Sequence, residues 1–404
     1  LLDWDGERPP GCSPRVELEN VPRFWEHLSD HTRFLKRYGT FCLNLSEQNL
    51  ARLYKQFGSN IQGQMPAWMQ KQRYWLNGQK AKAIKIKALP IDQLPQYSYK
   101  MPPIGEYQHR AVIFLRNLPL APLLADCGVG KSYCVLTSTA LQINDGTIRP
   151  GKTLVCGKLN TLFSGWRNDC LRFTNLTPEV LWAPQSKNRR ELIEKTIRES
   201  TADLFIINHE GVLVFEDALT EKGFEKVVVD ESTILKGFHG EDKRIKGGSF
   251  GKALMNVARN AKWRVIMSGT PAPNGPLDLW GQFHFLDPQG LIIEPWFNDF
   301  RSATHKEIIL GKDRGPKTPR KWIIKPGAVD RVANMIDPFA YRVRLRDVLK
   351  YLPERTNIVR DVGMSPEQSR HYADMEDRLR VVIDDTRITA QGKLTELMKL
   401  RQIT

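Results

Sequence analysis

The sequence predicts an α/β fold built on a doubly wound parallel sheet. From about residue 108 to 287, short β-branched or apolar runs alternate with stretches of helical periodicity. A Gly-rich turn follows the first of these runs, and an adjacent pair of acids follows a later one. At 404 residues the chain is too long for one ordinary core, so we expect two or three units.

The predicted strands are short and lack strict alternation, which is typical of a sheet covered on both faces. They are expected at residues 122–125, 153–156, 180–182, 204–207, 227–229 and 264–267. Helices are expected between them at 131–141, 162–173, 189–199 and 251–259. This order of elements is that of a nucleotide-binding domain.

The turn after the first strand has the sequence form of a phosphate cradle. Backbone N–H groups of such a turn face the phosphates, Lys131 would place a positive charge near the β and γ groups, and the Ser132 hydroxyl would bind Mg²⁺. Ala125 stands where the full motif has its first glycine, so a plain Gly turn is the alternative. The predicted nucleotide-binding residues of the turn are Gly128, Val129, Gly130, Lys131 and Ser132.

Two adjacent carboxylates, Asp230 and Glu231, follow the β-branched run 226–229. Ligands of open α/β sheets bind at the carboxyl ends of the strands, where this pair is expected to lie. Asp230 could then reach Mg²⁺, and Glu231 could orient or deprotonate the water that attacks the γ-phosphate. A strand that ends in a solvated acidic pair is the alternative, which the upstream cradle disfavours.

A net charge of +15 and a pI near 9.5 indicate an anionic partner, with nucleic acid as the first expectation. No apolar stretch approaches the ~20 residues that span a bilayer, so we expect no membrane partner. The six cysteines form no CxxC pair and are expected to be buried thiols, which favours an intracellular location, in the cytoplasm or nucleoid or in a nucleus.

Outside the core domain the chain is basic. Residues 1–100 are expected to form a small α+β accessory domain, in which 51–100 combine nine Lys and Arg residues with one acid and with Trp68, Tyr74 and Trp75. Such a surface suits nucleic acid, although core aromatics beside a solvated face would give the same composition. A Pro-rich linker is expected at 90–104, a basic insertion or nucleic-acid clamp at 291–345, and a helical connector at 346–404.

Several motifs, in order, resemble those of superfamily 2 helicases and most closely their Swi/Snf-like DNA translocases. Tyr107-Gln108 resembles an adenine-reading motif, 206–210 a TTYE-like segment, and Ser268-Gly269-Thr270-Pro271 a coupling motif. Residues 154–167 resemble the family's segment of a strand followed by Asn-Trp, with Gly157 in place of the usual proline and a glycine before Trp166. The acidic motif 230–233 departs from the family pattern at its last two positions. Further similar segments, within a resemblance that covers roughly 105–404, are 274–280, 285–288, 341–344, 352–353, 364–368 and 400–403.

This resemblance implies a RecA-like P-loop NTPase domain at 105–290 that uses ATP and Mg²⁺ to move on DNA, with double-stranded or branched DNA as the partner. It implies that Gln108 reads adenine, that Ser268, Gly269 and Thr270 couple hydrolysis to DNA, and that Lys131, Asp230 and Glu231 are catalytic. The DNA-contact candidates are Lys158, Asn160, Trp166 and Asn208, with a core aromatic as the alternative for Trp166.

Motors of this kind close ATP between two RecA-like lobes. The resemblance therefore implies a second lobe, supplied by a further segment or a partner protein, without which the chain is expected to bind ATP and hydrolyse it poorly. Two other functions stay open: a helicase that separates strands at forks, and an ATP-gated DNA-binding scaffold without motor activity.

Overall fold

The computed structural model describes residues 32–35, 40–43, 67–183, 188–238, 249–294, 296–309 and 320–348, with shorter pieces at 358, 360, 362–378, 380–383, 386–389 and 400–401. The chain divides into two compact units, Leu1–Lys350 and Tyr351–Thr404. Most of the accessory domain predicted at 1–100 lies outside the described residues. Before residue 67 the structure describes an antiparallel pair, β1 (Thr32–Leu35) and β2 (Thr40–Leu43).

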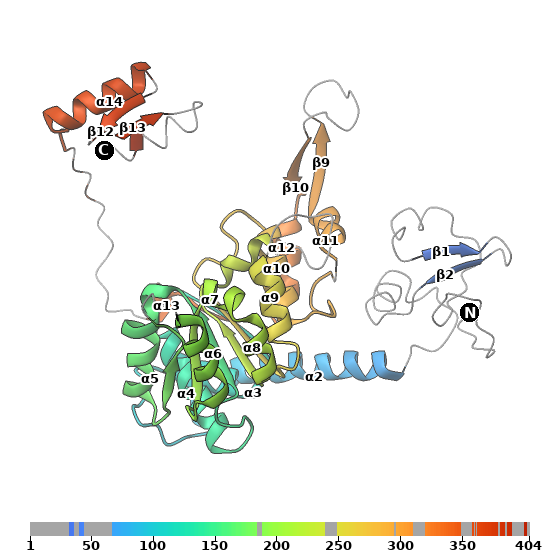
Figure 1. Cartoon of the computed structure of the whole chain (residues 1–404). Helices are drawn as coiled ribbons and strands as arrows, with labels where there is room; N and C mark the ends of the chain where they lie inside the picture. Colours follow the sequence, from blue (N-terminus) through green and yellow to red (C-terminus); the bar gives the residue numbers. More distant parts are fainter. Residues whose placement is uncertain are drawn as a thin grey trace. The chain divides into compact units, whose positions relative to one another are not determined.

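The first unit is organised around a seven-stranded parallel sheet with the strand order β11-β3-β8-β7-β4-β6-β5 (Figure 1). All six predicted strands are present. The strand predicted at 180–182 lies at 178–180 instead. It ends at Val180 because the chain turns there, with the Trp182 N–H donating to the Val180 carbonyl. The strands are β3 (Leu120–Ala125), β4 (Thr153–Gly157), β5 (Pro178–Val180), β6 (Leu204–Asn208), β7 (Lys226–Val229), β8 (Trp263–Ser268) and β11 (Tyr341–Val343).

The edge strand β11 was not predicted. It pairs in parallel with β3, although it lies within the segment 291–345 that the sequence places outside the core domain. The Asp126 N–H donates to the carbonyl of Val343, and the Leu345 N–H donates to the Asp126 carboxylate at 2.9 Å. The sheet therefore continues past the predicted boundary at residue 290, and its last strand contacts the start of the phosphate loop.

Two layers of helices cover the sheet, each with its own hydrophobic core. One core is formed with α2 (Ala67–Ala88), α3 (Glu106–Asn117), α4 (Lys131–Asn144) and α5 (Asn168–Phe173). The other is formed with α6 (Arg189–Glu199), α7 (His209–Val214), α8 (Glu216–Lys222), α9 (Ser249–Val257), α10 (Leu277–Leu286), α11 (Phe297–Thr304) and α12 (Ala328–Ile336). The predicted doubly wound fold is confirmed.

The first unit also contains several shorter elements. They are the 3₁₀ helices η2 (Ile91–Gln93), η3 (Leu159–Thr161) and η5 (Ser232–Gly237), the π-helix η4 (Leu162–Arg167), the hairpin β9 (His305–Ile309) and β10 (Arg320–Ile324), and α13 (Leu345–Val348). The predicted linker 90–104 packs on the domain, because Lys100 donates to the carbonyls of Leu171 and Thr174 and Tyr133 donates to that of Met101.

A buried ammonium ties α4 to β7. The Lys226 side chain, which is fully buried, donates to Thr139 Oγ1 at 2.9 Å and to Gln142 Oε1 at 2.7 Å. Burial away from water lowers the pKa of Lys226 to about 7. The helix that follows the phosphate loop and the strand that precedes the acidic pair are therefore joined at the end remote from both.

The second unit corrects one expectation. The helix α14 (Pro366–Arg378) is followed by an antiparallel hairpin, β12 (Arg380–Ile383) and β13 (Thr386–Thr389), where the sequence predicts a continuous helix. The residues after 378 include Val381, Val382, Ile383 and Ile388, β-branched types that favour strands over helices.

The expectation for the cysteines has a mixed outcome. Of the four cysteines whose side chains the structure describes, Cys134, Cys156 and Cys170 are buried as predicted, whereas Cys127 is exposed in the phosphate loop. In the described part of the chain, no helix combines the length and apolar character needed to cross a bilayer.

Gly281 provides a test of how tightly the helical layer packs on η5. A Cβ atom at this position of α10 would lie 2.1 Å from the Leu235 carbonyl oxygen and 2.8 Å from that of Phe238. We expect Gly281→Ala to lower the free energy of unfolding by about 2–3 kcal/mol, because two backbone segments would have to separate. Thermal denaturation measures this, with Gly237→Ala as the control, since its Cβ would meet no atom within 4 Å. Equal melting temperatures for the two variants would contradict the packing argument.

Candidate nucleotide-binding site

The site is built at the carboxyl ends of three neighbouring strands. β8 pairs with β3 on one side and with β7 on the other, with Leu124 opposite Ser268 and Val229 opposite Ile266. The phosphate loop follows β3, the segment Ser268–Thr270 ends β8, and the acidic pair follows β7. Three segments that lie far apart in the sequence are thereby brought to one edge of the sheet.

The phosphate loop has the backbone geometry that its glycines allow. Gly128 and Gly130 have φ angles of 84° and 82°, in the left-handed region that other residues rarely adopt. α4 begins at Lys131, so its first N–H groups point into the loop. Lys131 donates to the carbonyls of Ala125 and Asp126, both at 3.0 Å, which places its ammonium across the loop.

Gln108 contacts this loop directly. Its side chain is buried, its Nε2 donates to the Val129 carbonyl at 3.1 Å, and its Oε1 accepts from the Ile104 N–H at 2.9 Å. A Cβ atom on Gly130 would lie 2.4 Å from that Nε2. Gln108 therefore supports the phosphate loop, and its predicted contact with adenine stays a prediction.

Asp230 is held from two elements. Its Oδ2 accepts from the Trp166 indole at 3.1 Å, its Oδ1 accepts from the Glu231 N–H at 2.9 Å, and its carbonyl lies 3.1 Å from the His209 ring. Burial raises the pKa of Asp230, and the indole hydrogen bond opposes that rise. Trp166 is thus a buried partner of the acidic pair, which corrects the expectation that its side chain faces DNA.

Glu231 is the one described residue other than glycine with a positive φ, at 49°. This left-handed conformation costs an L-residue roughly 1–2 kcal/mol, and such strain clusters at functional sites. It turns the chain sharply from β7 into η5, directly after Asp230. The strain thus coincides with the position that the sequence predicts as catalytic.

Ser132 and Asp230 offer the kind of oxygen ligands that Mg²⁺ takes in nucleotide sites, one or two protein groups completed by phosphates and water. The donor set therefore fits the predicted ion. The Ser132 hydroxyl donates to Asp169 Oδ2 at 2.5 Å. Asp169 lies in the first turn of α5, directly after the π-helix that carries Trp166. Both predicted magnesium ligands are therefore bonded to residues of one continuous segment.

The predicted coupling segment packs on the phosphate loop. Ser268 is fully buried and its hydroxyl accepts from the Thr270 N–H at 3.1 Å. A Cβ atom on Gly269 would lie 3.4 Å from the Ala125 carbonyl and 3.6 Å from the Asp126 Cα. The coupling role stays a prediction. Because the segment packs on the phosphate loop, a change in the conformation of the loop would alter the contacts of this segment.

Sequence reasoning missed two residues that join these segments, Asp169 and Gln282. Gln282 is fully buried in α10; it donates to the Pro271 carbonyl at 2.6 Å and accepts from the Ser232 hydroxyl at 2.7 Å. It therefore bridges the end of the coupling segment to the residue after the acidic pair. The available signal was an amide within the largely apolar run 279–286.

The remaining DNA-contact candidates follow β4 and β6. Lys158 and Asn160 are exposed, whereas Asn208 is half-buried and donates to Glu210 at 2.7 Å. Exposed apolar side chains accompany them, since Leu159 is 51% and Phe163 42% exposed. These positions share one edge of the sheet with the phosphate loop, and contact with DNA stays a prediction.

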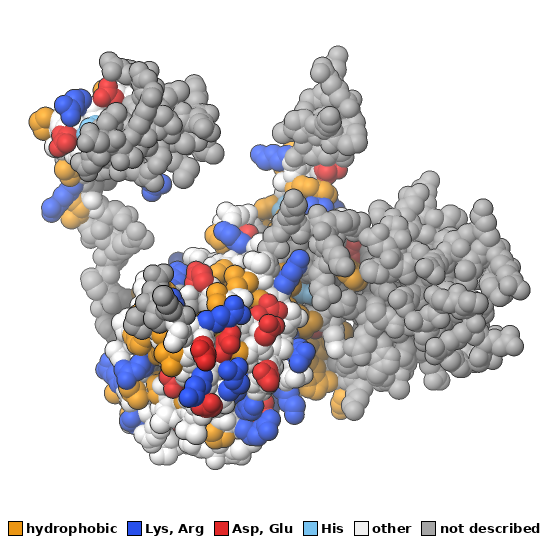
Figure 2. All heavy atoms as spheres, viewed as in Figure 1, with side chains coloured by type: hydrophobic (Ala, Val, Ile, Leu, Met, Phe, Trp, Pro, Cys, Tyr) orange, Lys and Arg blue, Asp and Glu red, His pale blue; other side chains and the backbone are white. Residues whose placement is uncertain are grey.

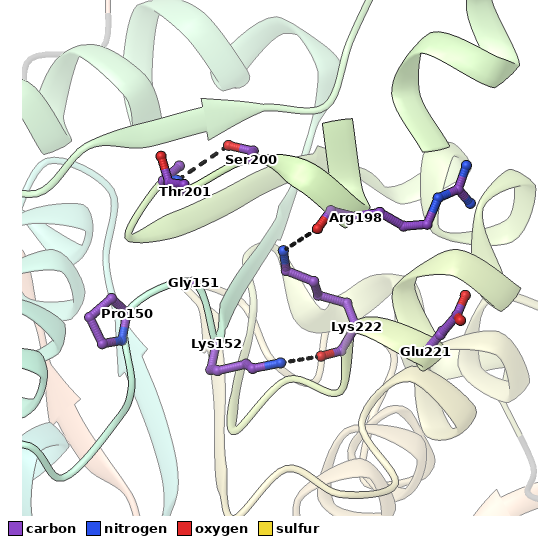
Figure 3. Close-up of a pocket in the computed structure, with 9 residues that line it drawn as sticks. Pro150, Gly151, Lys152, Arg198, Ser200, Thr201, Glu221 and Lys222 are labelled. Atoms are coloured by element: carbon purple, nitrogen blue, oxygen red, sulfur yellow. Dashed lines mark hydrogen bonds between the residues drawn. The ribbon is translucent and has the colours of Figure 1, made fainter. Parts of the chain in front are cut away.

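A hollow of about 370 Å³ lies elsewhere, among residues 150–152, 198–202 and 221–222 (Figure 3). Its lysines are engaged with the backbone: Lys152 donates to the Lys222 carbonyl, and Lys222 donates to the Arg198 carbonyl. The hollow precedes β4 and β6, so it lies at the amino ends of the strands. It contains none of the predicted site residues.

Comparison with known proteins matches the SNF2-related domain model to residues 107–404. The chain belongs to this family. The SNF2-related domain here is 27% identical over 303 residues to "Putative protein p41" of Acyrthosiphon pisum secondary endosymbiont phage 1, covering 74% of this chain and 62% of that protein. It is 25% identical over 285 residues to the human lymphoid-specific helicase, covering 67% and 31%. The chain thus spans less than two thirds of either relative.

Among solved structures, the SNF2-related domain is similar to the SWI2/SNF2 ATPase core of Sulfolobus solfataricus in complex with dsDNA. The TM-score is 0.47 at 20% sequence identity, with 77% of this chain and 60% of that chain covered.

The contact between Gly130 and Gln108 gives a testable coupling. We expect Gly130→Ala to destabilise the chain more than Gly128→Ala, because both strain φ but only the first drives a Cβ into the Gln108 amide. In a Gln108→Ala background the extra cost should disappear, which a double-mutant cycle of melting temperatures measures. An unchanged extra cost in that background would show that the amide does not support the loop.

Proposed function

We propose that this chain is an ATP-dependent DNA translocase of the Swi/Snf-like type, which couples ATP hydrolysis to movement along duplex DNA. One observation carries the proposal: in a member of the SNF2-related family, the phosphate loop, the segment Ser268–Thr270 and the acidic pair end three adjacent strands. The name of one relative, the human lymphoid-specific helicase, supports it.

The roles follow from the chemistry of each side chain. Lys131 and the N–H groups of 128–131 would bind the phosphates, with Ser132 and Asp230 holding Mg²⁺, which when bound supplies positive charge to the β and γ oxygens. Glu231 would accept the proton of the attacking water. Ser268 and Thr270 would sense the γ-phosphate from β8, next to the loop.

The duplex itself would be held through its phosphates, by the exposed candidates Lys158 and Asn160 together with Asn208 at the end of β6. Phosphate contacts carry little sequence information, so we expect weak sequence preference and strong dependence on salt. Arginines that complete the site would come from a second RecA-like lobe, as a further segment or a partner protein.

ATP turnover measured with duplex DNA, with single-stranded DNA and without DNA tests the proposal. We expect duplex DNA to give the highest rate, and Lys131→Ala to weaken ATP binding at least ten-fold, because the variant loses the charge that faces the phosphates. Lys195→Ala, an exposed lysine of α6, is the matched control. ATP binding with DNA-independent turnover would contradict the translocase. Nucleotide-dependent DNA binding without turnover, when the second RecA-like lobe is also supplied, would favour the ATP-gated scaffold. Unwinding of a labelled fork would favour the strand-separating helicase.

Gln282 is a positioning residue for coupling. Gln282→Leu should leave the Kd for ATP within about two-fold but reduce the stimulation of turnover by DNA several-fold. The variant loses the two hydrogen bonds that join the acidic and coupling segments, to Ser232 and Pro271, at about 1 kcal/mol each. Gln142→Leu is the control, since this equally buried amide contacts Lys226 rather than the site. Loss of stimulation in both variants would indicate a general loss of stability.

A further inference from the structure

The helix α2 has a charge pattern unlike that of the domain it contacts. Its 22 residues include six Lys and Arg and no Asp or Glu. The surface of the domain seen in Figure 2 instead carries basic and acidic side chains side by side. In α6, for example, Arg190 pairs with Glu194 and Lys195 with Glu199. The positive charge of α2 is therefore not balanced within the helix.

One face of α2 attaches it to the domain. Leu76, Ala83 and Ile86 are buried, Lys87 donates to the carbonyls of Asp337 and Ala340, and Arg110 donates to the last turn of α2. In Figure 1, α2 passes along α3 and extends beyond it. The apolar face is thus already covered.

Another side of α2 carries aromatic and basic side chains in a line; at its edge, partial burial and the like charge of Arg116 in α3 lower the pKa of Lys82. Tyr74, Gly78, Lys82 and Lys85 follow one another at intervals of four, four and three residues, so they share one side of the helix. Tyr74 is 83% exposed, and Trp75 beside it is 41% exposed. In the described part of the chain, Lys82 and Lys85 form no hydrogen bond or ion pair. We call this line of residues the α2 stripe.

Gly78 lies in the middle of the α2 stripe, where the described part of the chain gives no steric reason for a glycine. A Cβ atom there would meet no atom within 4 Å, so nothing in the domain requires a glycine. Glycine inside a helix is less stable than alanine. A residue that weakens the helix and leaves its backbone uncovered suits the close approach of a molecule from outside.

We propose that the α2 stripe binds a single strand of nucleic acid, with phosphates at Lys82 and Lys85, backbone passing Gly78, and an unpaired base stacked on Tyr74. The proposal rests on the function proposed above, since it supplies a second nucleic-acid contact besides the motor site. Positive charge together with exposed aromatic rings is the chemistry that holds unpaired strands, because every base offers a face for stacking. Duplex DNA offers phosphates but no free base face.

A membrane surface is a poorer occupant. Basic helices that lie in a bilayer insert a continuous apolar face. In α2 that face is buried against the domain, and the α2 stripe is separated from it around the helix. Phosphate recognition is shared with anionic lipids, so the test includes vesicles.

The experiment measures fluorescence anisotropy of a labelled 20-nucleotide single strand and of the matching blunt duplex, titrated with the whole chain at two salt concentrations. Tyr74→Ala should weaken strand binding about ten-fold and duplex binding less than two-fold. The double variant Lys82→Gln/Lys85→Gln should reduce the salt dependence of strand binding by about one unit of slope. The control is Lys195→Gln/Arg198→Gln, a double change of two basic residues on α6, which should alter neither.

Gly78→Ala separates the proposal from simple misfolding. It should raise the melting temperature and still weaken strand binding, because the added methyl group blocks the approach. Unchanged strand binding in all three α2 variants would overturn the proposal, as would an effect confined to phosphatidylserine vesicles. Turnover stimulated by duplex DNA should persist in these variants, and strand binding should persist in Lys131→Ala. Failure of one proposal is therefore distinguishable from failure of the other.

Discussion

The parallel pairing of β3, β8 and β7 is the constraint on which the site depends. Strands that run in the same direction end at the same edge of the sheet, so the loops that follow them lie side by side. Three loops that are far apart in the sequence are therefore close together in space. With β8 in the middle, Ser268–Thr270 lies between the phosphate loop and the acidic pair. A register shift in either pair would move one loop away from the other two.

Side chains from outside these loops then join them. Trp166 forms a hydrogen bond with Asp230, and Asp169 forms one with Ser132. Gln282 forms hydrogen bonds with both Ser232 and Pro271. The first two come from the segment after β4, where the exposed candidates Lys158 and Asn160 also lie. This segment includes a π-helix, a form that frequently marks functional sites. The predicted ion site and the predicted DNA face are thus linked through a few residues of one segment.

The sequence predicted those parts of the domain that local pattern determines. Glycines next to Lys131 and Ser132 and β-branched residues before Asp230 specify their own conformations, and six strands followed from the alternation of elements. β11 was not predicted, because a strand of three residues is too short to show a periodicity. The hairpin β12–β13 was not predicted, because the charged residues of this segment have a spacing typical of a helix. The contacts that Asp169 and Gln282 make could not be predicted, since their partners lie 37 and 50 residues away and only folding brings them together.

The ammonium of Lys226 has a consequence for motion in the domain. It joins α4 to β7 at the end remote from the loops, where Thr139 and Gln142 accept its hydrogen bonds. Two elements that share a buried anchor open together rather than separately, so their amides exchange with solvent only when the whole lobe opens. Fast local exchange is then confined to the loops at the carboxyl edge, and the helix and strand that bear the site behave as one rigid piece.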